Sequence, residues 1–206
     1  MILRRVRVLV PADLAHLPQC SSGCLTDQLN SQAPWARAAL ERWGMAGLAI
    51  DAGGTTAGYL LVCPGRDLPP SHPLSGHAVR PETVVLMALH VVDADRHTGV
   101  ARHLVQSASA RLLGRADGIE AVGCRVGSSC LSPSARWLHQ VGFELVEGMD
   151  WLPDGAQRLR LDLDRTVRWP DLAKLAQLLP SAIPTWGTPA TDRSGVSVAG
   201  PARRAD

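Results

Sequence analysis

The sequence predicts an α/β domain with a mixed, partly parallel central sheet of about six or seven strands flanked by helices. Two observations support this class. Residues 83–146 alternate strand-like and helix-like patterns, an order that demands a right-handed crossover and a parallel strand pair. Residues 45–51 and 56–63 instead form an expected antiparallel hairpin, because the turn residues at 51–54 join them. A sheet with both kinds of connection is mixed.

The N-terminal elements follow from periodicity and capping. Residues 3–10 alternate in polarity, which predicts a half-buried first strand, and Pro11 then opens a short helical turn. Residues 34–43 predict an amphipathic helix. Pro34 suits its first position and Gly44 ends it.

The second half is built around a buried strand at residues 83–92, which is almost continuously apolar and therefore expected to be covered on both faces. The preceding residues 64–81 carry five prolines and predict a long connection without regular structure. The remaining predicted elements are a helix at 100–115, a strand at 119–126, a helix at 132–140, and strands at 143–146 and 158–163.

We expect one domain over residues 1–168 and a short helix over 169–180, where apolar residues recur at helical spacing. Residues 181–206 are rich in Pro, Gly, Ser, Thr and Ala, a composition with little apolar bulk. Such a segment cannot bury enough surface to fold, so a disordered tail is expected there.

Composition excludes several classes of function. The 206 residues carry a net charge of +2, with 21 basic and 19 acidic side chains, so no nucleic-acid partner is expected. No apolar run of about 18 residues predicts a membrane span, and no signal-peptide core follows the start. The expected location is cytoplasmic. The five cysteines are accordingly expected to be reduced thiols.

Residues 96–102 lie between the buried strand and the helix that follows it. Gly99 allows close approach of a ligand to the backbone, and Ala101 is too small to block it. The first amides of the helix are unpaired and lie at the positive end of its dipole. Arg96 and Arg102 add positive charge. The segment predicts a phosphate-binding turn.

This segment resembles the acetyl-CoA motif of the GNAT superfamily of N-acetyltransferases, Gln/Arg-x-x-Gly-x-Gly/Ala, through Arg96, Gly99 and Ala101. Residues 132–143 resemble the superfamily's later Asn-x-x-Ala-x-x-Leu-Tyr…Gly-Phe motif, and the likeness extends over residues 3–165. Leu17-Pro18-Gln19-Cys20 resembles, more loosely, an actinobacterial-type branch. That branch implies no substrate.

The resemblance implies acetyl-CoA as cosubstrate and no metal cofactor. The backbone of Leu89, His90 and Val91 would pair with the pantetheine arm, and residues 97–102 would hold the pyrophosphate. The implied cosubstrate-binding residues are Leu89, His90, Val91, Arg96, His97, Thr98, Gly99, Val100, Ala101, Arg102 and Ser132.

The sequence departs from the family's catalytic pattern. Many members use a tyrosine as general acid; counted from Ser132 its position falls on His139, and counted from Gly142 it falls on Leu138. His90 is then the candidate base and His139 the candidate acid. The alternatives are a core-facing ring for His90 and a solvated helix position for His139. Direct transfer without a dedicated base remains open.

Four cysteines carry alternatives of their own. Cys124 and Cys130 flank the predicted strand end near the expected thioester; as nucleophiles they would need a paired base, and otherwise they are buried thiols. Cys20 with Cys24 suggests a metal pair, but a structural zinc site normally needs four ligands.

The expected function is acetyl transfer to an amine of a small molecule, peptide or protein. The alternatives are a noncatalytic acyl-CoA sensor or interaction module of the same fold, and a nucleotide-binding fold that uses the same glycine turn. Expected partners are acetyl-CoA and an amine acceptor, without nucleic acid or membrane, and a homodimer is left open. The acceptor pocket is expected from residues 18–44, 64–81 and 147–157.

Overall fold

The structure, a computed structural model, describes residues 4–20, 29–146, 152 and 155–166. Its strands are β1 (Arg4–Leu9), β2 (Gly47–Ala52), β3 (Thr55–Pro64), β4 (Thr83–Val91), β5 (Gly118–Gly123), β6 (Glu144–Leu145) and β7 (Gln157–Asp162). Its helices are α1 (Pro34–Trp43), α2 (Val100–Leu112), α3 (Ala135–Gln140) and α4 (Leu163–Thr166), with short 3₁₀ turns at Pro11–His16, Gly65–Asp67 and Asp93–Asp95. The expected helix over 169–180 and tail over 181–206 lie outside the described residues.

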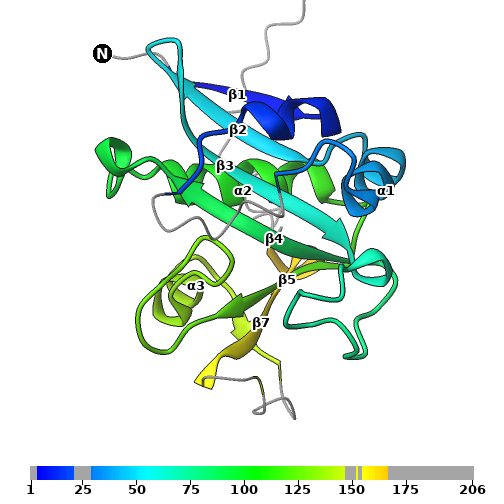
Figure 1. Cartoon of the computed structure of the whole chain (residues 1–206). Helices are drawn as coiled ribbons and strands as arrows, with labels where there is room; N and C mark the ends of the chain where they lie inside the picture. The colour runs from blue at the N-terminus through cyan, green and yellow to red at the C-terminus, as the bar shows by residue number, and fades with distance from the viewer. Residues whose placement is uncertain (1–3, 21–28, 147–151, 153–154, 167–206) are drawn as a thin grey trace, which may run out of the picture. The chain divides into compact units, whose positions relative to one another are not determined.

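Within the described part of the chain, seven strands form one sheet in the order β1-β2-β3-β4-β5-β7-β6 (Figure 1). Neighbouring strands are antiparallel except β4 and β5, which are parallel because α2 crosses over between them. The predicted mixed, partly parallel sheet is confirmed. No described helix is both long and apolar enough to cross a lipid bilayer.

Helices cover both faces of the sheet, which explains the apolar run of β4. On one face Leu104 and Leu112 of α2 pack in a cluster with Leu60 of β3. On the other face Trp35 of α1 packs with Tyr59, the neighbour of Leu60. Alternate residues of a strand point to opposite faces, so β3 and β4 contribute apolar side chains to both layers.

The connection over residues 64–81 covers one end of the sheet. Beyond the turn at Gly65–Asp67 it has no helix or strand, as its prolines predict. Its Leu74 is fully buried and forms a satellite cluster with Val85 of β4, Val122 of β5 and Leu152. This long loop is therefore packed against the sheet.

β4 has two halves with different neighbours. Residues 83–85, here called the closed half, pair with residues 118–120 of β5 on one side, and Val84 and Val85 also pair with β3 on the other. Residues 86–91, the open half, pair with β3, while the ladder to β5 ends at Val85. β4 and β5 therefore diverge beyond Val85.

β5 ends earlier than the sequence predicts, at Gly123 rather than residue 126. Cys124 leaves the sheet ladder and bridges Ser134 instead, with its N–H donating to Pro133 at 2.9 Å. The same bridge delays α3, which starts at Ala135 rather than at residue 132. Residues 124–134 thus form a loop pinned at its base, the β5–α3 loop.

Candidate functional site

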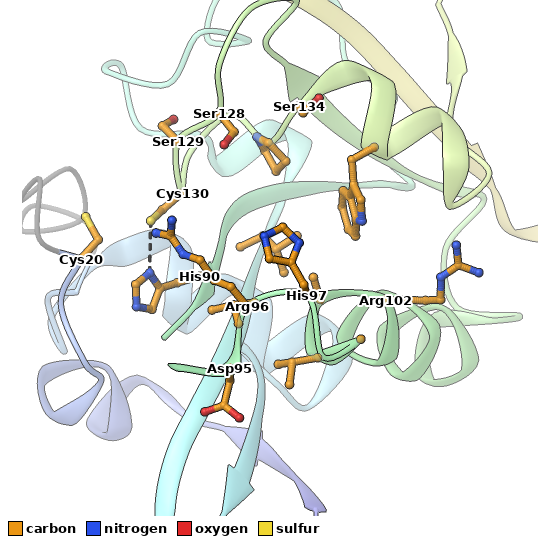
Figure 2. Close-up of a pocket in the computed structure, with 17 residues that line it drawn as sticks. Cys20, His90, Asp95, Arg96, His97, Arg102, Ser128, Ser129, Cys130 and Ser134 are labelled. Atoms are coloured by element: carbon orange, nitrogen blue, oxygen red, sulfur yellow. Dashed lines mark hydrogen bonds between the residues drawn. The ribbon is translucent and has the colours of Figure 1, made fainter. Parts of the chain in front are cut away.

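A cleft of about 690 Å³ opens where β4 and β5 diverge (Figure 2). Its walls come from the open half of β4, the turn before α2, the start of α2, the β5–α3 loop and α3. The lining residues are Cys20, Leu89, His90, Val91, Asp95, Arg96, His97, Gly99, Val100, Ala101, Arg102, Ser128, Ser129, Cys130, Pro133, Ser134 and Trp137.

The turn before α2 presents amide groups to this cleft. The first intrahelical bond runs from the His103 N–H to the Gly99 carbonyl at 3.0 Å, so the amides of residues 100–102 precede the helical ladder. Gly99 has φ = 86°, a left-handed conformation that favours glycine, and open space surrounds the place where a Cβ would stand. The sequence thus builds a helix N-terminus that a ligand can approach closely.

The same turn holds a second left-handed residue, His97, at φ = 62°. Within the described residues it is the one non-glycine with positive φ, a conformation that costs other L-residues about 1–2 kcal/mol. Thr98 follows it, and the Thr98 carbonyl accepts a hydrogen bond from Arg4 of β1 at 2.9 Å. The turn is tied to the edge of the sheet by that bond.

Side chains of both charges line the cleft. Arg96 and Arg102 line it and are exposed, and Asp95 lines it beside them. Arg96 Nη2 lies 2.7 Å from Asp93 Oδ1 in an exposed ion pair, which leaves most of the guanidinium donors for another partner. The arginines supply the positive charge that the sequence motif predicts.

His90 extends from the open half of β4 into the cleft. Its side chain is 6% exposed, its Nδ1 lies 3.2 Å from Cys130 Sγ, and its ring lies 5.2 Å from the ring of Tyr59. Burial lowers the pKa of His90, and the charge of Arg96 lowers it further, against a smaller opposite effect of Asp93. The imidazole is therefore neutral at pH 7 and able to accept a proton.

Tyr59 is not placed as a general acid. Its ring is fully buried, and its hydroxyl donates to the Pro18 carbonyl at 2.9 Å. The ring instead packs against His90, with 39° between the two planes. Tyr59 therefore acts as a wall that positions His90.

The backbone of the open half alternates between two neighbours. Val92 donates its N–H to Ala57 of the β3 side, so residues 90 and 92 face β3, while residues 89 and 91 face the cleft. The Leu89 N–H indeed points there and donates to the Cys130 carbonyl at 2.7 Å. Leu89 and Val91, rather than His90, therefore offer main-chain groups to a ligand.

Three of the predicted site residues do not line the cleft. Thr98 and Ser132 lie in its adjoining loops, and Ser132 pairs with Ser129 through main-chain and hydroxyl contacts. His139 is exposed at a separate depression of about 620 Å³ beside Arg125 and Arg136, with its Nδ1 2.9 Å from the Phe143 carbonyl. Their roles stay predictions.

The cleft also contains residues to which sequence analysis gives no role. Trp137 stands in the segment that resembles the second family motif, and Ser134 lies three residues before it, which is one helical turn. Cys20 lines the cleft, whereas Cys24 lies outside the described residues. No cluster of metal-ligand side chains occurs in the part of the chain that the structure describes.

Glu120 is part of a buried ion-pair network. It is buried in β5, where Arg158 of β7 approaches it at 2.6 Å and Arg160 at 3.2 Å. The Arg160 guanidinium also reaches Thr83 at 2.8 Å in the closed half of β4. This ion-pair network joins three strands away from the cleft.

The mixed sheet, in which β4 and β5 diverge beyond Val85 and a glycine turn leads into α2, is similar in fold to solved N-acetyltransferase structures. Ard1 from Thermoplasma volcanium matches with a TM-score of 0.51 and 11% identity, over 77% of this chain and 97% of that one. The PaiA N-acetyltransferase from Thermoplasma acidophilum, solved in complex with coenzyme A, matches with a TM-score of 0.50 and 10% identity, over 78% and 99%.

At these identities the likeness establishes the fold, and the predicted GNAT-type architecture is confirmed. No protein-family model matches the sequence, and no curated protein matches it.

Proposed function

We propose that the protein is an acetyl-CoA-dependent N-acyltransferase that acetylates an amine of a small molecule, peptide or protein in the cytoplasm. The observation that carries this proposal is the cleft, which runs from a buried neutral histidine on the open half of β4 to the exposed amides that begin α2. Acetyl-CoA has a matching order of groups, with a thioester at one end of the pantetheine and a pyrophosphate at the other.

The pyrophosphate is proposed to lie against residues 97–102, where the helix dipole and the N–H groups of residues 100–102, which precede the helical ladder, favour negative charge. Arg96 and Arg102 add two cationic side chains at the rim. The absence of a Cβ at Gly99 leaves the closest approach open. The wall opposite contains Pro133 and Trp137, which offer apolar surface.

The pantetheine is proposed to pair with the cleft-facing main chain of Leu89 and Val91. The Leu89 amide already donates to Cys130, so binding there exchanges one carbonyl acceptor for another. Such an exchange changes the net free energy little, because a hydrogen bond is lost for each one gained. The β5–α3 loop and the cosubstrate therefore compete for one donor.

In acetyl transfer a neutral amine attacks the thioester carbon, the new C–N bond forms and the C–S bond breaks. The amine loses one proton and the coenzyme A thiolate gains one. His90 is the proposed base, because it is neutral, lines the cleft and follows Leu89 on β4. His139, remote from the cleft, is not needed in this scheme.

The binding half of this proposal is tested by Gly99→Glu. A carboxylate at the pyrophosphate position should weaken coenzyme A binding by at least about 100-fold, or about 2.7 kcal/mol, in calorimetry. Gly114→Glu is a matched control, since Gly114 follows the far end of α2, has φ = 70° and has the same open space around a Cβ. If both folded variants bound coenzyme A with equal affinity, the proposed pyrophosphate site at Gly99 would be wrong.

The catalytic half is tested by chromatographic detection of coenzyme A release with a panel of amines. Turnover on any amine supports the transferase. Tight acetyl-CoA binding without turnover on small amines, peptides or proteins favours the noncatalytic sensor, which the missing family tyrosine makes the second candidate. Equal affinity for ATP and coenzyme A supports the nucleotide-binding alternative.

A further inference from the structure

The cleft contains a thiol and an imidazole in contact. Cys130 Sγ and His90 Nδ1 lie 3.2 Å apart, and both residues line the cleft (Figure 2). They come from separate elements, 40 residues apart in the chain, so no local sequence pattern holds them together. The pair has the arrangement that activates a cysteine nucleophile, a thiol within reach of a neutral base.

The main chain of Cys130 fixes this thiol at the open half of β4. Its carbonyl accepts from the Leu89 N–H at 2.7 Å while its sulfur contacts His90, so two consecutive β4 residues hold one loop residue. On the far side of His90 the buried Tyr59 ring limits rotation of the imidazole. Both partners of the pair are thus positioned before any ligand binds.

We propose that Cys130 is a catalytic nucleophile that takes the acetyl group from acetyl-CoA as a thioester on Sγ and then passes it to the amine. This inference rests on the proposed transferase function and adds a covalent step to it. In the ligand-free protein the Cys130 carbonyl accepts from the Leu89 N–H; when the pantetheine takes over that N–H, the contact between Sγ and His90 keeps the thiol in the cleft.

Each step balances without an additional reactant. The Cys130 thiol gives its proton to His90, Sγ attacks the acetyl carbon, and the bond from that carbon to the coenzyme A sulfur breaks. The departing thiolate takes the proton from His90. In the second step the amine nitrogen attacks the acetyl carbon, the bond to Sγ breaks, and the amine proton returns to Cys130 by way of His90.

The first step exchanges one thioester for another, so it needs no energy source. The neutral state of His90, which burial favours, suits a proton acceptor. Cys63 of β3 is a useful contrast, because burial raises the pKa of its thiol strongly and the thiol contacts the Pro64 carbonyl, not a base. A thiol of that kind stays protonated and unreactive.

The test is intact-protein mass spectrometry after the full chain is mixed with acetyl-CoA in the absence of amine and quenched in acid. We expect one added acetyl group, which peptide mapping places on Cys130 and which neutral hydroxylamine removes. Cys130→Ala should stay unmodified while it still binds coenzyme A in calorimetry. Cys124→Ser, a partly exposed cysteine outside the cleft, is the matched control and should acetylate like the parent.

His90→Gln should slow formation of the acetylated protein by at least about tenfold, because loss of a general base typically costs more than that. Added amine should discharge the acetyl group at the rate of turnover, and initial rates should follow a double-displacement pattern.

A parent protein that binds acetyl-CoA and turns over while it stays unmodified would overturn the covalent step and leave the transferase intact. An acetyl group on Cys20, or one on Cys130 that amines do not discharge, would also overturn it. A parent that binds no acetyl-CoA overturns both proposals.

Discussion

Both halves of β4 are mostly apolar, but their edges have different neighbours. The closed half is paired on both edges, and the ion-pair network of Glu120, Arg158 and Arg160 braces the strands beside it. The open half keeps one edge for the cleft, where main-chain groups of Leu89 and Val91 are turned away from β3.

The difference arises in the neighbouring strand. β5 holds to β4 for three residue pairs, and after Gly123 the chain turns away into the Cys124–Ser134 bridge. A strand that is fully buried for stability thereby gains an edge for binding. Stability and ligand binding should respond separately to substitutions in the two halves.

Arg158→Met removes one ion pair from the network beside the closed half. It leaves Glu120 buried with one partner, so the free energy of unfolding should fall by about 3 kcal/mol, the lower end for broken buried pairs, because Arg160 still reaches Glu120 at 3.2 Å. Urea denaturation measures this loss. The exposed Arg5 of β1 gives the control Arg5→Met, with little expected change. Coenzyme A affinity of folded Arg158→Met should equal that of the parent.

His72 makes the cover of the closed half sensitive to acid. It is 5% exposed, its Nδ1 accepts from the Leu74 N–H, and burial lowers its pKa to about 4. The unfolded chain binds the proton near pH 6.5, so this contribution to stability is complete above pH 6.5 and is lost as the pH falls toward about 4.

The difference should reach about 3 kcal/mol in urea denaturation between pH 7 and pH 4. His72→Gln, which does not titrate, should flatten that part of the profile. His103→Gln, at an exposed position of α2, should leave it unchanged. A steep profile in both variants would assign the acid sensitivity to other groups.

The open half is tested by amide exchange. Coenzyme A should slow hydrogen exchange at Val91 by about tenfold, because its cleft-facing N–H gains an acceptor. Leu89 should change less, since its N–H exchanges the Cys130 carbonyl for a ligand group. Residue-resolved exchange by NMR measures both amides in one sample. Equal changes at the two positions would contradict the proposed competition.

The smallest effect is expected at His139. Its side chain is exposed at the separate depression, so His139→Ala should keep turnover within about twofold, as surface substitutions usually do. His90→Gln provides the comparison within the cleft. A loss of about 100-fold in His139→Ala would instead restore His139 as the general acid.

Sequence patterns predicted most of the fold because apolar periodicity and turn residues are local. The hairpin, the buried strand and the crossover helix were all predicted from runs of ten to twenty residues, within a few residues of their observed bounds. The end of β5 was misplaced because the strand-forming Val126 extends the apparent strand, while Ser134, which draws Cys124 out of the sheet, lies ten residues after that cysteine.

The features of the candidate site likewise divide into those that local sequence determines and those that depend on the tertiary fold. The glycine turn at Gly99 could be predicted from the sequence, because the start of a helix depends on neighbouring residues in the chain. The contact between Cys130 and His90 was not, because it joins a loop to a strand through the tertiary fold. The left-handed backbone of His97 had no signal either, because glycine, not histidine, is the usual residue at such an angle.

The pinned base of the β5–α3 loop has a practical consequence. Val126, two residues after that base, is 93% exposed and outside the cleft, whereas Cys130 further along the same loop contacts β4 directly. A fluorophore installed at residue 126 through an unnatural amino acid would sit clear of the ligand, yet move with the segment that the ligand displaces. One loop would thus supply both the proposed nucleophilic sulfur and a position for an optical reporter of ligand binding in the cleft.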